Sequence, residues 1–296
     1  MTLANRGLFL AAIGCLLASL IAPAWGADGA AGKINVLIID GQNNHKWQET
    51  TPVLKEMLLQ TGRFNVDVLT SPPAKAPKDA WEKFRPDLSK VNVVLVNYTG
   101  SPWSKDIEKD FETFVQNGGG LVFYHAAVFS HPRWETWNLM MGMGWRDAKA
   151  GDRLVLDDSG KVVRTPKGEG PRSGHGPAHA FAVVMRDKDH PVMKGLPEKW
   201  THVKDELYHG MRGPAKDMHI LATAWSDPKG KGTGAHEPMA WTVPCGTGRV
   251  FVTLLGHDVP ALKAPVGAAL LVRGVEWAAT GKVTIPAPKA PAAATE

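Results

Sequence analysis

The sequence is poor in cysteine, with two among 296 residues, Cys15 and Cys245. Because Cys15 lies in an N-terminal segment that we expect to be removed, the mature chain would keep one cysteine and form no intramolecular disulfide. The sequence also lacks an excess of one charge, since 34 lysines and arginines accompany 29 aspartates and glutamates along the chain. A nucleic-acid-binding protein gathers its basic residues on one face or helix, so we expect no nucleic-acid partner.

Long apolar runs are scarce as well, and the longest lies at the N-terminus. Residues 7–21 are almost wholly apolar, Arg6 is the only charge among the first 26 residues, and Ala24-Trp25-Gly26 places small residues at positions −3 and −1 of a cleavage site. This pattern predicts a signal peptide over residues 1–26 and an exported protein, periplasmic or extracellular. A membrane anchor needs about 20 apolar residues. An anchor, or a lipid on Cys15, is therefore the weaker alternative, and we expect no stable membrane anchor.

Short apolar segments separated by helical ones predict an α/β domain over residues 33–282. Strands are expected at 34–40, 65–70, 91–97, 121–124, 219–225, 239–243 and 249–255, and helices at about 48–60, from Ser104 to Asn117, and at about 264–279. Strands linked by helices of this length form right-handed βαβ units, which favours a mostly parallel central sheet. From about 134 to 197 the pattern loosens into an inserted, loop-rich region with short strands at 153–156 and 181–185. The Pro/Ala-rich tail, 283–296, is expected to be disordered.

Three histidines follow predicted strands, and this placement makes them the first candidates for a site. His45 follows the first strand, His125 ends the fourth and His257 follows the last. Ligands of an open parallel sheet bind outside the carboxyl ends of its strands, so we expect these three side chains to converge there. Carboxylates in Asp205-Glu206 and in His236-Glu237 are further candidates. Other histidines are expected to be ordinary surface or core residues: His131, His175, His179, His190, His202, His209 and His219.

Aromatic residues and the one remaining cysteine complete the list of candidates. Five tryptophans lie in or near predicted loops, where aromatic faces can contact the C–H face of a sugar ring: Trp47, Trp103, Trp134, Trp137 and Trp145. Ordinary packing under long loops is an equally good interpretation of each. Cys245 lies in a turn between two strands with no helix N-terminus to lower its pKa, so we expect a structural thiol.

Several motifs together resemble the ThuA-like (trehalose utilisation) family over about residues 33–280. The motifs are residues 118–127 (GGGLVFYHAA), 205–208 (DELY), 237–242 (EPMAWT) and 255–258 (LGHD), in this order. The resemblance implies a class I glutamine amidotransferase-like fold, which is a three-layer flavodoxin-like sandwich. Amidotransferases of that fold carry a cysteine nucleophile on the turn where this chain has His125. Because an imidazole there cannot replace a thiolate, we expect no cysteine-dependent amidotransferase.

The resemblance and the residue chemistry together suggest roles for the candidates. We expect His125, Glu206 and His257 to be catalytic. With His45 they could hold a divalent metal, Zn²⁺ or Mn²⁺. Metal-free acid/base catalysis, with Glu206 as the partner of a histidine, is the open alternative. No nucleotide cofactor is expected. Substrate contacts are expected from Trp47, Tyr208, Glu237 and Asp258.

The family's link with trehalose use implies a small saccharide substrate, either a glycoside or a 3-keto-glycoside. A ring carbonyl acidifies the neighbouring C–H, so one general base and one electrophile suffice for enolisation and then elimination, isomerisation or hydrolysis. The resemblance thus implies an exported carbohydrate-processing enzyme that uses general acid/base chemistry. The alternative is a non-catalytic periplasmic saccharide-binding protein, which needs aromatic residues and hydrogen-bond donors but no group of tuned pKa.

Overall fold

The computed structural model describes residues 32–288, so the expected signal peptide lies outside the described residues. The strands are β1 (Ile34–Asp40), β2 (Phe64–Thr70), β3 (Val93–Val96), β4 (Gly120–Tyr124), β5 (Arg153–Leu156), β6 (Val162–Thr165), β7 (Gly174–His175), β8 (His179–Met185), β9 (Lys199–Asp205), β10 (Tyr208–His209), β11 (His219–Trp225), β12 (His236–Cys245) and β13 (Gly248–Thr253). The helices are α1 (Trp47–Gln60), α2 (Lys78–Lys83), α3 (Lys105–Gln116), α4 (Glu135–Met141), α5 (Val259–Leu262) and α6 (Pro265–Thr280). None of the described helices is long and apolar enough to cross a membrane.

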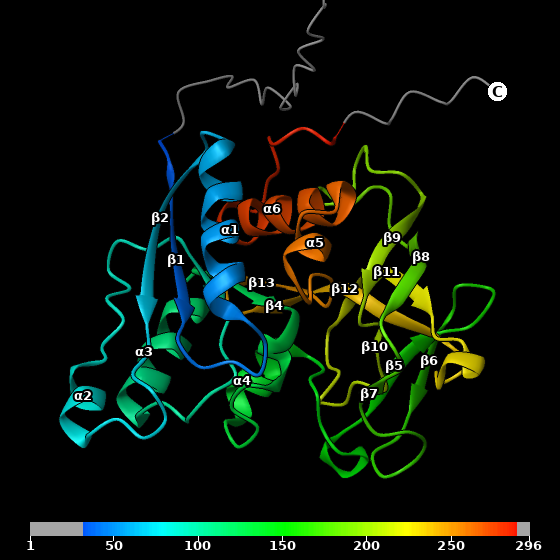
Figure 1. The fold of residues 1–296 in the computed structure, drawn as a ribbon, viewed down its shortest axis with the longest axis horizontal. Helices are drawn as coiled ribbons and strands as arrows, with labels where there is room; N and C mark the ends of the chain where they lie inside the picture. The colour runs from blue at the N-terminus through cyan, green and yellow to red at the C-terminus, as the bar shows by residue number, and fades with distance from the viewer. Residues whose placement is uncertain (1–31, 289–296) are drawn as a thin grey trace, which may run out of the picture.

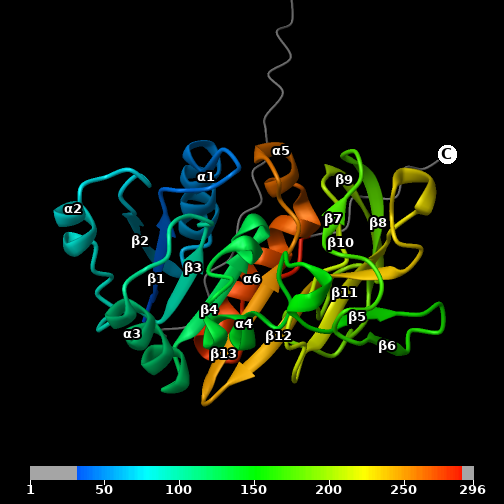
Figure 2. The same ribbon diagram turned by 90° about the horizontal axis from the view of Figure 1, so that it is seen from below.

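A large mixed sheet runs through the molecule in the order β2-β1-β3-β4-β13-β12-β11-β8-β9. Its first five strands are parallel, and their order is that of flavodoxin-like doubly wound sheets. From β12 onward the pairing is antiparallel. The two parts lie at opposite ends of the molecule (Figures 1 and 2).

The expected mostly parallel sheet is therefore correct only for the first part. The hairpin at Gly246, where φ is +58°, reverses the chain between β12 and β13 and begins the antiparallel part. The region expected to be loop-rich supplies β5, β6 and β8, and β8 extends the main sheet. Period-two patterns this short, interrupted by glycine-rich turns, indicate strands but not their partners.

Helices cover both faces of the parallel part of the sheet. α1 and α6 contact each other above the sheet in the view of Figure 1, and α6 packs on β4 and β13. α3 and α4 lie below it and share the contact between Phe111 and Trp137. The strands between these layers, such as the fully buried β3, are apolar throughout because both of their faces are covered.

The domain extends beyond residue 282, where the sequence placed the start of the tail. The buried Glu276 carboxylate of α6 accepts hydrogen bonds from the backbone N–H groups of Thr284 and Ile285, at 2.8 and 3.0 Å. The Ile285 side chain is buried in the core, and its carbonyl accepts from Arg273. A Pro/Ala-rich composition hid these contacts, because they depend on partners in α6. Residues 289–296 of the expected tail lie outside the described range.

Candidate functional site

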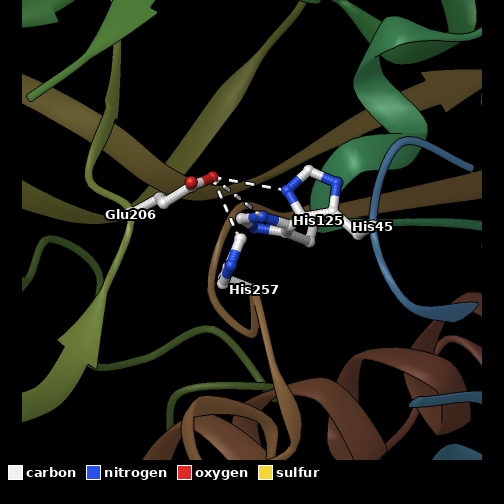
Figure 3. A group of neighbouring side chains, drawn as sticks. All are labelled: His45, His125, Glu206 and His257. Carbon is white, nitrogen blue, oxygen red and sulfur yellow. Dashed lines mark hydrogen bonds and ion pairs between the residues drawn. The ribbon is translucent and has the colours of Figure 1, made fainter. Parts of the chain in front are cut away.

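The structure brings His45, His125, Glu206 and His257 into one cluster at the carboxyl ends of the parallel strands (Figure 3). One possible ligand atom from each residue lies within 4.8 Å of the others. Glu206 Oε2 lies 3.1 Å from His257 Nδ1, 3.3 Å from His45 Nε2 and 3.8 Å from His125 Nε2. The ring centroids of His125 and His257 are 5.6 Å apart. Four separate chain segments therefore meet at one carboxylate oxygen.

His125 is held in one orientation by the backbone on both sides of it. It follows the last residue of β4 with φ at +44°, a left-handed conformation that turns the side chain off the strand. Its Nδ1 lies 2.6 Å from the Leu254 carbonyl oxygen. Because a carbonyl only accepts, Nδ1 carries the hydrogen and donates it. In the neutral ring the lone pair is then on Nε2, which faces Glu206 and has no hydrogen-bond partner among the described residues.

Asp205 positions the backbone that carries two members of the cluster. Its buried carboxylate accepts from the backbone N–H groups of Glu206 at 2.7 Å, Gly256 at 2.7 Å and His257 at 3.1 Å. The imidazole of His202 lies 2.8 Å away. Burial alone would raise the Asp205 pKa, but the His202 hydrogen bond, the neighbouring His125 and the Gly256 N–H outweigh it and lower the pKa. The carboxylate therefore remains ionised and holds both segments.

The cluster holds one carboxylate among three imidazoles. Burial acts to raise the Glu206 pKa, but the imidazoles of His125, His257 and His45 outweigh burial and lower it. The hydrogen bond to Glu206 raises the pKa of His257, whereas burial lowers the pKa of His45. An ionised carboxylate thus lies among imidazoles, which is a donor set that Zn²⁺ and Mn²⁺ both accept.

The cluster opens into a cavity of about 720 Å³, a size typical of small-molecule sites. The lining residues are Asn44, His45, Lys46, Glu49, Thr50, Phe129, Trp145, His175, Glu206, Tyr208, His257, Asp258, Val259 and Pro260. Phe129 and Trp145 stack on each other, with ring centroids 4.5 Å apart. The cavity therefore combines aromatic surface with the polar cluster.

The model of the trehalose utilisation family, ThuA, matches residues 35–278. The chain belongs to the ThuA family. It is 42% identical to a ThuA-like protein from Parabacteroides merdae, whose crystal structure superposes with a TM-score of 0.82 over 87% of this chain and 94% of that one. A ThuA-like protein from Bacteroides uniformis is 20% identical, with a TM-score of 0.55 over 88% of this chain and 96% of that one, and shares the fold. A search of curated proteins found no match.

Two of the four residues expected to contact substrate line the cavity of this ThuA chain. Tyr208 and Asp258 do, and the Tyr208 hydroxyl lies 3.4 Å from His45 Nε2. Trp47 is half-buried at the start of α1 and is not a lining residue. Glu237 is also absent from the lining, because its carboxylate is buried in β12 against Arg153 and accepts from Thr233. Glu237 therefore forms a buried ion pair with Arg153 and does not face the cavity.

His175, which the sequence predicts to be an ordinary surface or core residue, lines the cavity. Its Nε2 lies 3.7 Å from Glu206 Oε1. It lies on the two-residue strand β7, where it pairs with Tyr208 of β10. A strand of two residues leaves no recognisable pattern in the sequence, so the sequence could not predict this position for His175. Trp145, one of the five loop tryptophans, also lines the cavity.

Cys245 lies at the end of β12 beside the hairpin, and its partner in the sheet is Gly248 at the start of β13. The cluster lies beyond the opposite end of β13, so the thiol is remote from it. Burial and the nearby Glu112 raise the Cys245 pKa, which keeps the thiol protonated and unreactive at neutral pH. The geometry agrees with the expected structural role.

Proposed function

We propose that this ThuA-family protein is an exported enzyme that acts on a glycoside or 3-keto-glycoside by metal-assisted general acid/base chemistry. The observation that carries the proposal is the meeting of three imidazole nitrogens at one carboxylate oxygen beside a cavity of substrate size. Family membership supports a saccharide substrate, because the matching family is described by trehalose utilisation.

The residues present fit a divalent metal ion. Ligand atoms about 2.1 Å from one ion lie roughly 3.5 Å from one another in a tetrahedral site. The separations of 3.1, 3.3 and 3.8 Å around Glu206 Oε2 are of this size. The hydrogen bond from His125 Nδ1 to the Leu254 carbonyl is the kind of outer contact that fixes a ligating histidine. His45, His125, Glu206 and His257 would hold the ion.

The remaining cavity residues would bind and orient the sugar. When bound, a divalent ion would act as a Lewis acid toward a substrate oxygen. Burial and the charges of Glu206 and Asp205 raise the Tyr208 pKa, so its hydroxyl stays protonated and can donate a hydrogen bond to the substrate. Phe129 and Trp145 offer apolar faces to the C–H groups of a pyranose ring. His175 points its Nε2 toward the cluster and would exchange a proton with a ring carbon or hydroxyl.

The test combines metal analysis with a substrate screen. Purified wild-type protein and His125→Ala would be analysed for bound metal and assayed with disaccharides and their 3-keto forms. We expect about one ion per chain in the wild type, and the joint loss of metal and turnover in the variant. His219→Ala is the control, since His219 is exposed and pairs with Asp187 away from the cavity. Full turnover by metal-free protein would refute the metal's role in catalysis. Tight binding of a saccharide without turnover would identify a saccharide-binding protein.

Export is tested separately, by mass spectrometry of protein recovered from the native host. We expect the chain to begin near Ala27, because Ala24 and Gly26 meet the requirement for small residues before the cleaved bond. An intact Met1 on protein recovered from the cytoplasm would contradict export.

A further inference from the structure

His45 differs from His125 in how its ring is held in the cluster. His125 donates from Nδ1 to the Leu254 carbonyl, whereas His45 Nδ1 is buried and has no hydrogen-bond partner among the described residues. The His45 ring instead packs edge-on against the rings of His125 and His257, at centroid distances of 4.9 and 4.6 Å. The direction of its Nε2 therefore depends on where the backbone places the residue.

The backbone of His45 is held by an asparagine two residues earlier in the chain. His45 lies in the connection between β1 and α1, and its backbone N–H donates to Asn43 Oδ1 at 2.9 Å. The Asn43 side chain is itself fixed, because its Nδ2 donates to Asn97 Oδ1 at 2.9 Å. Two hydrogen bonds in series therefore join the His45 backbone to Asn97.

Asn97 follows the last residue of the buried strand β3 and is 2% exposed. Its side-chain Nδ2 donates to the hydroxyl oxygens of Thr50 and Thr51 in α1, at 3.1 and 3.0 Å. Asn97 therefore contacts the chain on both sides of His45, at Asn43 before it and at the beginning of α1 after it.

The chemistry of the Asn97 amide suits this position. An amide offers two donor hydrogens on one atom and an acceptor on the other, and Asn97 uses both kinds. Because the amide is buried, removing it leaves its partners without a replacement from solvent. These hydrogen bonds thus fix the connection between β1 and α1 relative to the end of β3.

We propose that Asn97 and Asn43 are positioning residues, which act through the His45 backbone to hold the His45 imidazole in the cluster. Neither residue lines the cavity of the cluster, so each acts only through other residues. The consequence for metal binding rests on the proposed function, whereas the consequence for the His45 backbone does not.

The experiment measures two quantities, exchange of the His45 backbone amide in metal-free protein by NMR and affinity for Zn²⁺ by calorimetry. Asn43→Ala removes the acceptor of the His45 N–H. We expect exchange of this amide to become about fivefold faster or more, and Zn²⁺ affinity to fall about tenfold or more. Asn97→Ala should change both quantities in the same direction but by less, because it frees the Asn43 side chain without removing the acceptor.

A conservative variant at position 43 tests the route through the backbone. Asn43→Asp keeps an oxygen that can accept from the His45 N–H, so exchange of this amide should stay within about twofold of the wild-type rate. This variant is judged on amide exchange alone, because the added negative charge itself attracts a cation.

Asn92→Ala is the matched control. Asn92 Oδ1 also accepts from a backbone N–H, that of Asn35 at 2.8 Å, but at the amino ends of β1 and β3. This variant should speed amide exchange at Asn35, which shows that the measurement detects the loss of such a bond. It should leave His45 exchange and Zn²⁺ affinity unchanged.

The outcomes separate this inference from the proposed function. Faster His45 exchange in Asn43→Ala, in a protein that binds no Zn²⁺, would support the positioning role and refute the metal site alone. Wild-type Zn²⁺ affinity in Asn43→Ala would overturn the inference and leave the metal site in place. Unchanged His45 exchange in Asn43→Ala, fast exchange in Asn43→Asp, or an equal fall in Zn²⁺ affinity in Asn92→Ala would overturn it as well. Where the buried Asn97→Ala fails to fold, Asn43→Ala still answers the question, since Asn43 is only half-buried.

Discussion

Asp205 is the residue on which the geometry of the cluster depends most directly. Its carboxylate accepts three backbone N–H groups, those of Glu206, Gly256 and His257, besides the His202 imidazole. The amide of an asparagine has one oxygen to accept with, and its NH₂ group would face a donor. The order and spacing of His257 and Glu206 in the sequence say nothing about this connection, because the two segments are 51 residues apart.

We therefore expect Asp205→Asn to loosen the cluster as well as the fold. Leaving at least one buried donor unpaired should lower the free energy of unfolding by about 1–3 kcal/mol. Affinity for the proposed metal ion should fall by about 10-fold or more, because Asp205 positions two of its proposed ligands. Urea unfolding and metal titration would measure the two effects. Lys204→Ala, at the exposed neighbouring position, is the control, and unchanged metal affinity in Asp205→Asn would refute the positioning role.

His131 also predicts how stability depends on pH. Its pKa is lowered to about 3 in the folded state, and the ordinary value of 6.5 applies when the chain unfolds. The unfolded state therefore binds more protons between these values, and stability falls as the pH falls below about 6.5.

Uptake of one proton on unfolding changes the free energy of unfolding by at most about 1.4 kcal/mol per pH unit. His131→Leu should lose that part of the slope between pH 6 and pH 5, where few carboxylates titrate. Urea unfolding of the wild type and the variant at these two pH values is the measurement. His190, whose pKa burial lowers to about 4, contributes in both proteins and cancels in the difference. Equal slopes of the unfolding free energy against pH in the wild type and in His131→Leu would contradict this prediction. They would show that folding does not change the pKa of His131.

At the scale of elements, the short 3₁₀ segment His125–Phe129 is fixed by one buried guanidinium. Arg146 donates to the carbonyls of Val128, Phe129 and Ser130, at 2.9, 3.2 and 2.6 Å, and also to Asn138 Oδ1. The segment leads from His125 in the cluster toward the buried His131. Its conformation therefore affects the position of His125.

Arg146→Lys should detach this segment although it keeps the charge. The planar guanidinium of Arg146 donates in several directions, and a single lysine ammonium cannot reach all of the same acceptors. Several buried carbonyls would therefore lose their donor. We expect the unfolding free energy to fall by about 2–4 kcal/mol, with faster hydrogen exchange over residues 125–131. Arg249→Lys provides the comparison, because Arg249 also donates to several carbonyls, those of Trp277, Ala278 and Ala279, and lies near the amino ends of the parallel strands, away from the cluster. Equal exchange over residues 125–131 in both variants would contradict a specific role for Arg146.

The sequence predicted those elements whose signals are local. Apolar strands such as β1 and β3 are recognisable because both faces are covered, and α3 is capped by Ser104, whose side chain accepts from the Ile107 N–H. The positions of His45, His125 and His257 at the ends of predicted strands also predicted that they lie together, as they do. The sequence did not predict the partner of each strand in the antiparallel part. The pairing of β8 with β11, for example, is set by side chains distant in the sequence.

At the scale of the whole molecule, the site combines parts with different degrees of predictability. The parallel part of the sheet supplies the three histidines, whereas Glu206, Tyr208 and His175 come from the antiparallel region and its small second sheet. Glu206 was predicted from family resemblance and its carboxylate chemistry, and His175 was not predicted, because neither follows a strand of the parallel part. Glu237 was expected to contact the substrate. Its carboxylate instead lies in a buried strand, where it is paired with Arg153 inside the core.

The C-terminal limit of the folded unit gives a last prediction, made for the molecule as a whole. Glu276 is buried, and besides Arg63 its hydrogen-bond donors are the N–H groups of Thr284 and Ile285 and the Thr284 hydroxyl. A chain ending at residue 282 loses these donors and exposes the pocket of Ile285. We expect it to be about 2–4 kcal/mol less stable than the full chain, from the unpaired carboxylate and the lost apolar burial. A chain ending at residue 288 keeps every one of these contacts and should unfold at the same urea concentration as the full chain. Equal midpoints for the two truncated chains would place the limit of the folded unit at residue 282, as the composition of the tail first indicated.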